Sequence, residues 1–426
     1  MYRASAIGTL NGQEPMSKKI LFLSALDFKE KSIQVIRKTP EAFRDAGWEV
    51  RYIVARDNLP RGNYGYEAEI NPAGIRVERF AWPLARLRNT QAGRALSYVW
   101  TKIASLAVVL QLALRGAQAL RREAADVIYG YEVQGVLAAR LLKMVGASGG
   151  ALVVHRFQGT SVTEMLEGRQ RVRQLVNLDQ ILALRSACDL VIMTDDGTKG
   201  NEALRRVGSR AANLRFWVNG ADEPKELQPT QEFRRRLGVG PDELVLVSVS
   251  RLAGWKRVDR GLAIAEELKR LGVAFVYLVV GGGSEYERLE RLSRDLGIAD
   301  QVIFTGPVPQ SDVYDYMNAA DVFISTYDMS NVGNPLLEAI RMGKLIVTLR
   351  NGATGDWITH GQSGLIYDPS QDISQVAASD IARLVRDAAW ADELRKGVRA
   401  VARERLWTWR DRMNAEVSDV EMLLEK

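Results

Sequence analysis

The sequence is poor in cysteine and histidine. Cys188 is the single cysteine in a chain of 426 residues, and His155 and His360 are the two histidines. No disulfide can form within the chain, which excludes a disulfide-stapled secreted scaffold and favours a reducing compartment. These three side chains are also too few for a structural zinc site.

The first residues do not predict a secretory leader either. Residues 1–15 are polar and lack an apolar centre, and the next apolar run, residues 20–26, fits a buried strand. We expect residues 1–18 to be a disordered extension. The chain is 46% apolar and 26% charged, which is typical of globular proteins, and its length predicts two or three domains.

Acidic residues are absent from one long segment of the first half. Between Arg79 and Arg122 there are eight Lys and Arg residues and no Asp or Glu. Residues 103–114 inside it are apolar, but a membrane span needs about 20 residues. Two interpretations stay open. The segment either lies on anionic lipid, with Trp82 and Trp100 at the headgroups, or is a domain helix with a solvated basic rim and residues 103–114 in the core.

Short apolar runs alternate with helical stretches along the whole chain. Such runs indicate parallel sheets that helices cover on both faces, and two series of them imply an α/β protein with two Rossmann-like domains. The predicted strands are residues 20–26, 49–54, 126–129, 151–154 and 190–194 in the first half, and residues 244–250, 275–280, 302–305, 322–325 and 345–348 in the second.

A domain boundary is expected near residues 219–224, where Asn, Gly, Asp and Pro cluster. This predicts a first domain over residues 19–221 and a second over residues 222–405. Residues 406–426 then form an amphipathic helix that we expect to pack back on the first domain. Ligands of such sheets bind at the carboxyl ends of the strands, so the chemistry is expected in the cleft between the domains.

Two cations follow the predicted strand of residues 244–250. Arg251 and Lys256 share one loop at its carboxyl end, where they would form a clamp for a diphosphate. The guanidinium binds phosphate oxygens as a fork, and the ammonium acts as a point charge. The alternative is a pair of solvated loop cations.

Residues 330–343 (SNVGNPLLEAIRMG) predict a helix that Asn334 caps, with Pro335 in its first turn. Amides at the start of a helix have no partner within it, and those of Leu336 and Leu337 would suit a phosphate. The alternative is a well-capped surface helix without a ligand.

Glycines and one acid add to this pattern. Gly333 lets a ligand approach the backbone, and Glu338, one turn inside the helix, is placed to accept hydrogen bonds from vicinal hydroxyls of a sugar. Gly281 and Gly282 would let the backbone pass near a phosphate or base, or would simply form a tight turn. The G-x-G-x-x-G spacing is absent, which argues against a nicotinamide or flavin dehydrogenase.

With these residues in place, the chain resembles the retaining glycosyltransferases of GT-B fold, in particular glycosyltransferase family 4 (glycosyl transferases group 1). The resemblance covers most of the chain and is strongest over residues 216–367. It rests on the order and spacing of WVNGAD, SRLAGWKR, LVVGGGSEYERL, VIFTGPVPQSDVYDYMNAADVFIS, NPLLEAIRMG and NGATGDWITHGQSGLIYD. It implies a GT-B architecture, in which a nucleotide-sugar domain faces an acceptor domain across a cleft.

The resemblance also implies roles for residues. In that family an Arg and a Lys hold the donor diphosphate and a Glu binds the donor ribose, which implies Arg251, Lys256 and Glu338 as the catalytic residues. The rest of the donor site would comprise Gly281, Gly282, Val308 (near the base), Ser330, Asn331, Gly333, Asn334, Pro335, Leu336 and Leu337. The acceptor side is expected at Gln158, Gly159 and Thr160.

The chain departs from the family's pattern at two places. Ser330 stands where a Glu usually contacts the donor sugar. We favour a pocket for a different sugar, with amide contacts from Asn331 or Asn334, over the alternative in which Asp328 supplies the carboxylate. In the first domain, Gln158 stands where the family often has a His.

We therefore expect a hexosyltransferase that moves a sugar with retention from a nucleoside-diphosphate donor, preferably UDP-linked. Its acceptor would be a glycan or lipid-linked molecule in bacterial surface polysaccharide or glycoconjugate synthesis. No metal, other cofactor or nucleic acid partner is expected. The location would be cytoplasmic, with residues 79–122 on the inner face of the membrane. A GT-B-shaped epimerase or phosphorylase, and a catalytically weak transferase-like binding subunit, remain alternatives.

Overall fold

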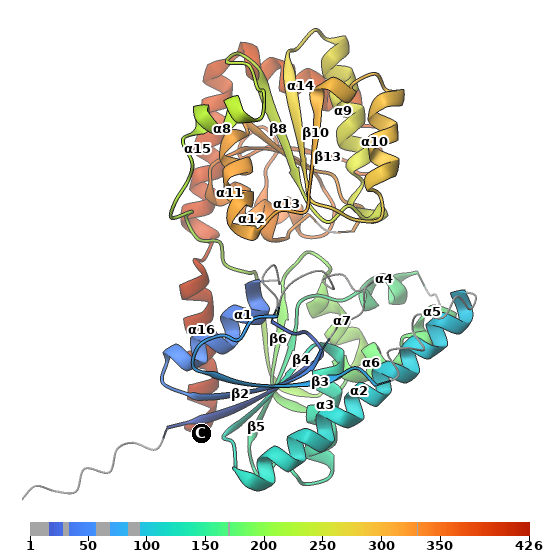
Figure 1. Ribbon diagram of the computed structural model, residues 1–426, viewed down its shortest axis with the longest axis vertical. Helices are drawn as coiled ribbons and strands as arrows, with labels where there is room; N and C mark the ends of the chain where they lie inside the picture. Colours follow the sequence, from blue (N-terminus) through green and yellow to red (C-terminus); the bar gives the residue numbers. More distant parts are fainter. Residues whose placement is uncertain (1–16, 29–33, 57–68, 84–93, 169–170, 330) are drawn as a thin grey trace, which may run out of the picture.

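The protein is described from a computed structural model that covers residues 17–426 without residues 29–33, 57–68, 84–93, 169–170 and 330. Most of the expected extension therefore lies outside the described residues. The rest folds into two α/β domains, one above the other along the longest axis (Figure 1). The predicted α/β class with two Rossmann-like domains is confirmed.

A parallel sheet forms the centre of the first domain. In the described part of the chain its strands are, in spatial order, β3 (Ile75–Ala81), β2 (Glu49–Arg56), β1 (Lys19–Ser24), β4 (Val127–Tyr131), β5 (Leu152–Phe157), β6 (Cys188–Thr194) and β7 (Ala211–Trp217). In the middle of the sheet, Leu23 of β1 pairs with Ile53 on one side and Gly130 on the other.

Helices cover both faces of this sheet. They are α1 (Gln34–Asp45), α2 (Arg94–Arg122), α3 (Glu132–Met144), α4 (Val162–Glu167), α5 (Arg171–Val176), α6 (Leu178–Leu184) and α7 (Gly200–Val207). Alternate residues of β1 point to opposite faces, so Phe22 packs in the cluster under α1, whereas Leu23 packs in the cluster under α2 and α3.

The second domain repeats this plan with a smaller parallel sheet. Its described strands are, in spatial order, β10 (Val302–Gly306), β9 (Phe275–Val280), β8 (Leu244–Val249), β11 (Val322–Ser325), β12 (Leu345–Leu349) and β13 (Leu365–Tyr367). Its helices are α8 (Thr230–Arg236), η2 (Gly254–Lys256), α9 (Val258–Arg270), α10 (Tyr286–Asp295), η3 (Ala299–Gln301), α11 (Gln310–Ala319), α12 (Asn334–Arg341), α13 (Thr354–Trp357), α14 (Ser374–Arg386) and α15 (Ala388–Arg405).

The last helix, α16 (Trp409–Leu424), lies against the first domain although it ends the chain (Figure 1). Its buried side chains join the cluster that α1 covers. Arg412 and Glu416 of α16 are almost fully buried and form an ion pair of 2.8 Å, and the Tyr129 hydroxyl donates to the same carboxylate. The buried Arg156 of β5 also faces Glu416, so this charge group ties α16 to the sheet.

Two crossings of the chain connect the domains. The outgoing segment follows β7 and the returning one precedes α16, and Ala221 N–H donates to the Trp407 carbonyl across them (2.9 Å). Arg341 of α12 donates to the carbonyls of Ala221 and Leu406, both at 2.8 Å. The crossings therefore form one bonded unit.

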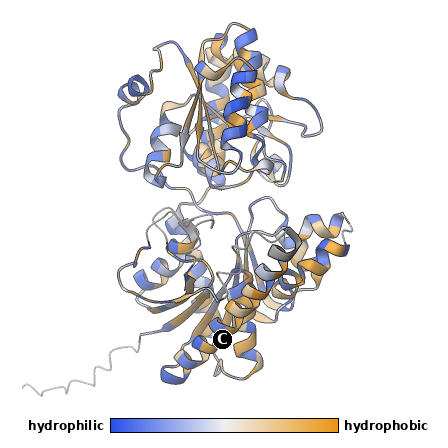
Figure 2. Ribbon diagram, turned by 45° about the vertical axis from the view of Figure 1, so that its right-hand side comes forward, coloured by the Kyte–Doolittle hydropathy of each residue, from blue (hydrophilic) through white to orange (hydrophobic). Residues whose placement is uncertain are grey.

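Helix α2 is amphipathic. One face of residues 103–114 lies in the core, as the second interpretation expects, with Val108, Val109 and Leu112 in the cluster under α2 and α3. The opposite face carries an apolar stripe that is 42–63% exposed, made of Val99, Ile103, Leu106, Leu110 and Leu114. Residues 99–122 also have the length and mean hydropathy (1.6) of a segment able to cross a membrane. Hydrophobic residues are interspersed with hydrophilic ones along the helices on this side of the domain (Figure 2).

Candidate functional site

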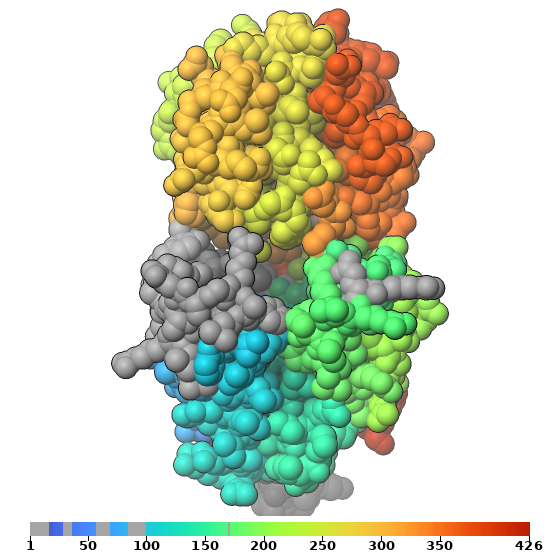
Figure 3. All heavy atoms as spheres, turned by 90° about the vertical axis from the view of Figure 1, so that its right-hand side faces the viewer, coloured from blue at the N-terminus to red at the C-terminus, as the bar shows by residue number. Residues whose placement is uncertain are grey.

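The loops at the carboxyl ends of the two sheets meet between the domains. The domains join at a waist (Figure 3). A Cβ added to Gly352 of the second domain would lie 2.3 Å from the Gly197 carbonyl of the first. Beside this contact, Thr160 and Lys199 of the first domain and Asp328 of the second line a hollow of about 340 Å³.

Arg251 and Lys256 lie where the sequence predicts, in the loop after β8. Arg251 is exposed, and Lys256 is half-buried at the end of η2. The glycine-rich loop after β9 supports this loop from behind, because a Cβ on Gly281 would lie 2.0 Å from the Ser250 carbonyl. Leu252 N–H also donates to the Gly282 carbonyl (2.9 Å). Gly281 and Gly282 therefore position the loop that carries both cations.

The ammonium of Lys256 lies in an aromatic cage. Its Nζ is 4.0 Å from the ring centroid of Trp255 and 3.6 Å from that of Tyr327. Burial and, to a smaller extent, the charge of Arg251 lower the pKa of Lys256 to about 7, against the opposing effect of Asp196 of the first domain. Lys256 is thus partly neutral near pH 7, and it is within electrostatic reach of both domains.

The loop after β11 uses its own polar groups internally. Asp328 forms ion pairs with Arg257 (3.1 Å) and Arg260 (2.9 Å). The buried Asn331 accepts a hydrogen bond from the Tyr327 N–H (3.0 Å), and its amide group donates to Asn351. Ser330 lies outside the described residues. Asn331 is thus engaged within the loop, whereas Asp328 is paired with two arginines and also lines the hollow between the domains.

The start of α12 differs from the expectation in two ways. Gly333 is the N-cap, and Asn334 is already helical, because its side-chain oxygen accepts a hydrogen bond from Asn219 between the domains (2.9 Å). The Leu337 amide is not available to a phosphate, since it donates to the Gly333 carbonyl (3.1 Å). Pro335 has no N–H, and the Leu336 amide has no acceptor among the described residues.

Glu338 is buried in the second turn of α12. Gln310 Nε2 donates to its carboxylate (3.2 Å), and the Tyr314 hydroxyl lies 3.5 Å from the same oxygen. Both partners come from α11, which begins two residues after Val308. Gln310 and Tyr314 are four residues apart directly after the Pro-Val-Pro loop, so they lie on one face of the helix. This spacing could have predicted both partners of Glu338 from the sequence.

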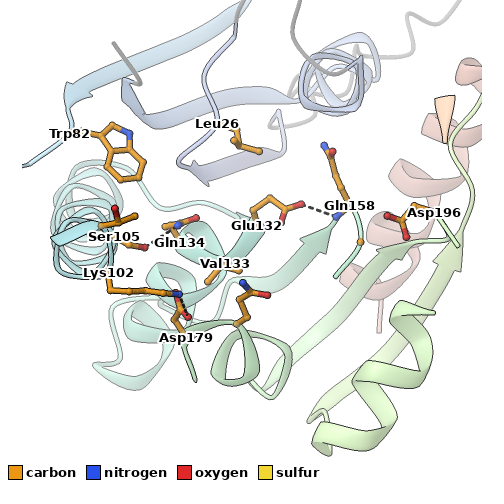
Figure 4. Close-up of a pocket in the computed structure, with 13 residues that line it drawn as sticks. Leu26, Trp82, Lys102, Ser105, Glu132, Val133, Gln134, Gln158, Asp179 and Asp196 are labelled. Carbon is orange, nitrogen blue, oxygen red and sulfur yellow. Dashed lines mark hydrogen bonds and ion pairs between the residues drawn. The ribbon is translucent and has the colours of Figure 1, made fainter. Parts of the chain in front are cut away.

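Gln158 and Gly159 line a cavity of about 630 Å³ in the first domain (Figure 4). Its walls come from the ends of β4, β5 and β6 and from α2 and α6. Thr160, the third expected acceptor residue, lines the separate hollow between the domains.

Two carboxylates in this cavity were missed by the sequence analysis. β4 runs into α3 without a linker, so Glu132 makes the turn itself, with a left-handed φ of 58°. Burial raises the pKa of Glu132 to about 7 and that of Asp196 to about 6. A Cβ on Gly159 would lie 2.1 Å from the Asp196 carboxylate, so only glycine fits there. Glu132 and Asp196 each lie just after a predicted strand, and this position could have indicated them as site residues from the sequence.

His155 is buried within β5 and lines neither the cavity of the first domain nor the hollow between the domains, and burial lowers its pKa to about 3. Among the described residues, no three His, Cys, Asp or Glu side chains are grouped to hold a metal ion.

Comparison with known proteins finds a family match within the second domain. Residues 229–405 match the family Glycosyl transferases group 1. The chain is 34% identical over 229 residues to D-inositol 3-phosphate glycosyltransferase of Acidothermus cellulolyticus, covering 51% of this chain and 50% of that protein. It is 30% identical over 187 residues to GDP-mannose-dependent alpha-(1-6)-phosphatidylinositol monomannoside mannosyltransferase of Mycolicibacterium smegmatis, covering 42% and 48%. The matches thus span about half the length of these relatives.

Solved structures resemble the whole chain. Sucrose-phosphate synthase from Thermosynechococcus elongatus superposes with a TM-score of 0.72 at 20% identity, over 96% of this chain and 99% of that one. HepE of Anabaena, in complex with UDP and glucose, superposes with a TM-score of 0.67 at 19% identity, over 95% and 99%. The expected GT-B architecture is confirmed by these neighbours.

Proposed function

We propose that the protein is a retaining glycosyltransferase of the family 4 type, because residues 229–405 match the family Glycosyl transferases group 1 and the whole chain has a GT-B fold. It moves a sugar from a nucleoside-diphosphate donor to a glycan or a lipid-linked acceptor. The observation that carries this proposal is the pair of cations, Arg251 and Lys256, held at the carboxyl end of β8 by the glycine-rich loop.

The two cations act on the leaving group. When the bond between sugar and phosphate breaks, negative charge develops on the departing diphosphate, and fixed positive charges stabilise that charge. The free Leu336 amide at the start of α12 adds a dipole of the same sign. Glu338 holds the ribose, with Gln310 and Tyr314 fixing its carboxylate. A donor phosphate oxygen takes the proton of the acceptor hydroxyl, which is consistent with retention.

The donor is proposed to be a UDP-sugar. HepE, which shares the fold, binds UDP and glucose, whereas one relative in sequence uses GDP-mannose. A thermal-shift screen of UDP-, GDP- and ADP-sugars decides between these bases, because a ligand that binds the folded state raises its melting temperature. Transfer is expected to proceed without a metal ion, which is checked by adding a chelator.

The acceptor is proposed to be presented at a membrane surface. The apolar stripe of α2 is exposed, and the segment from Arg79 to Arg122 carries eight cations and no acid. Exposed Val172 and Leu175 of α5 add apolar surface beside exposed Arg171 and Arg173. Apolar side chains among cations are typical of interfacial helices on anionic lipid. Relatives include enzymes named for phosphatidylinositol mannoside and diacylglycerol glycolipids.

The test of this function is release of nucleoside diphosphate from the donor found in the screen. Arg251→Ala and Lys256→Ala should each lower turnover at least ~100-fold, the scale of removing one charge contact from a transition state. Arg288→Ala, an exposed cation on α10, is the matched control and should leave turnover unchanged. Near-normal turnover in both cleft variants, or no donor hydrolysis by the unmodified protein, would reject the proposal; the second result would favour a binding subunit without chemistry.

A further inference from the structure

The cavity of the first domain is rich in carboxylates. Glu132, Asp179 and Asp196 line it, and Lys102 is the cation among its lining residues. Lys102 Nζ lies 2.7 Å from the Asp179 carboxylate, so these two charges offset each other. Glu132 and Asp196 remain, and both lie at the end of the cavity that Gln158 and Gly159 form (Figure 4).

One oxygen of Glu132 is fixed and the other is available. The Gln158 backbone N–H donates to its Oε1 (2.8 Å), while its Oε2 has no hydrogen-bond partner among the described residues. The left-handed backbone of Glu132, directly at the end of β4, points this carboxylate into the cavity rather than along α3 (Figure 4). A half-buried carboxylate with one unused oxygen is a strong acceptor for a hydroxyl group.

The remaining wall suits a ring with several hydroxyl groups. Gln134, Gln180 and Ser105 supply amide and hydroxyl groups. Gln134 Nε2 donates to Ser105 Oγ (3.0 Å) and Gln180 Nε2 donates to Asn177 Oδ1 (3.3 Å), so a ligand uses their remaining donor and acceptor positions. The indole of Trp82 lies near α2 at the other end of the cavity (Figure 4). Polar groups that both donate and accept hydrogen bonds recognise polyols without requiring charge.

An anionic ring does not suit this cavity. A phosphate placed near Glu132 and Asp196 would meet two carboxylates in a partly desolvated site, where repulsion between like charges is screened less than in water. Burial raises the pKa of both Glu132 and Asp196, and the charge of Asp196 also raises the pKa of Glu132. The Gln158 N–H and the buried Arg156 lower the pKa of Glu132. Glu132 therefore carries a substantial fraction of negative charge near neutral pH.

We propose that this cavity binds the acceptor as an uncharged polyhydroxylated ring, a sugar or a cyclitol, whose hydroxyl donates to Glu132, and that it selects against rings bearing phosphate. This inference rests on the proposed function, because the cavity opens beside Asp196, the residue within electrostatic reach of the donor-side Lys256. It names the class of acceptor, which the donor site alone does not define.

The test uses defined probes in the presence of the nucleotide identified by the donor screen. Methyl mannoside, methyl glucoside and myo-inositol are compared with mannose 6-phosphate, glucose 6-phosphate and inositol 1-phosphate by saturation-transfer NMR. The variants are Glu132→Gln, Asp196→Asn and, to fill the cavity without changing its charge, Val133→Trp. Glu123→Gln is the matched control, because Glu123 pairs with Lys19 at the start of β1, at the opposite end of the strands from the cavity.

At least one neutral probe should bind the unmodified protein more tightly than its phosphorylated counterpart. Losing one hydrogen bond to a charged group should weaken that binding about ten- to a hundredfold in Glu132→Gln, while nucleotide affinity stays unchanged. Val133→Trp should abolish probe binding, and Glu123→Gln should alter nothing. Three results would overturn this inference and leave the proposed function intact. They are tighter binding of the phosphorylated probes than of the neutral ones, an affinity for neutral probes that is unchanged in Glu132→Gln, and binding of a nucleotide when no neutral probe binds. Failure of every nucleotide to bind would overturn the proposed function and this inference with it.

Discussion

Nucleotide binding should depend on pH through Lys256. In the unliganded site the pKa of its ammonium is about 7, because burial against Trp255 and Tyr327 and the charge of Arg251 outweigh the opposing charge of Asp196. A bound diphosphate places negative charge beside it and raises this pKa. Binding above pH 7 must therefore take up a proton, and the affinity must fall as the pH rises.

The size of the effect follows from the fraction of Lys256 that is charged before binding. With a pKa of about 7, nucleotide affinity should fall roughly fiftyfold between about pH 7 and about pH 9, and binding near pH 8 should take up about 0.9 proton. A terminal phosphate with a pKa of about 6 is already ionised over this range, so the nucleotide itself contributes little.

Calorimetric titration in two buffers with different heats of ionisation measures this uptake directly. Lys256→Arg keeps a charge that cannot be lost, so it should bind with no proton uptake and no pH slope, whereas Lys256→Met should bind weakly at every pH. Glu132→Gln is the control for the other side chain with a pKa of about 7, and it should keep the full uptake. Proton uptake that persists in Lys256→Arg would refute the reasoning.

Three further results are expected. Changing Leu106, Leu110 and Leu114 of the apolar stripe to Gln should abolish sedimentation with anionic vesicles at low salt. The control, Val376→Gln with Val385→Gln on α14, changes side chains of similar exposure and should still sediment. Sedimentation that persists in the leucine variant would count against the membrane proposal. Glu338→Gln should lower nucleotide affinity about ten- to a hundredfold in calorimetry, since hydrogen bonds to a charged group contribute ~1.5–3 kcal/mol; unchanged affinity would place Glu338 outside the site. Glu416→Gln should lower the free energy of unfolding, measured by urea denaturation, by about 3–5 kcal/mol, because it leaves buried guanidinium groups uncompensated. If the free energy falls no more than in the control Glu421→Gln, at a half-exposed carboxylate, the buried charge group contributes little.

Most of the buried strands were predictable, whereas both edge strands of the first sheet were missed. Continuous apolar runs such as the one in β9, where every residue is buried, predicted most of both sheets. β3 (IRVERFA) and β7 (AANLRFW) carry Arg, Glu or Asn because each lies at the edge of its sheet, where one side faces solvent. The apolar pattern is therefore broken in them, and the sequence analysis missed both.

Site residues were predictable where a loop directly follows a strand. The prediction failed where a side chain binds a residue that is distant in sequence. Arg251 and Lys256 follow β8 at short range. Asn334 is a good capping residue, but Asn219, 115 residues away in sequence, binds its side chain and leaves Gly333 as the cap. Glu132 was missed because the analysis ended its strand at residue 129 and did not foresee a turn without a linker.

The return of α16 to the first domain affects how the chain is made. β7 leaves the ribosome about 190 residues before α16, which at 5–20 residues per second is a delay of roughly 10–40 s. During that time the sheet face under α1 lacks the side chains of Trp409, Met413, Val417 and Val420, and Arg156 lacks its carboxylate partner. The first domain to be synthesised is thus among the last to complete its core, and a ribosome that stalls within the second domain releases an open apolar surface to chaperones and proteases.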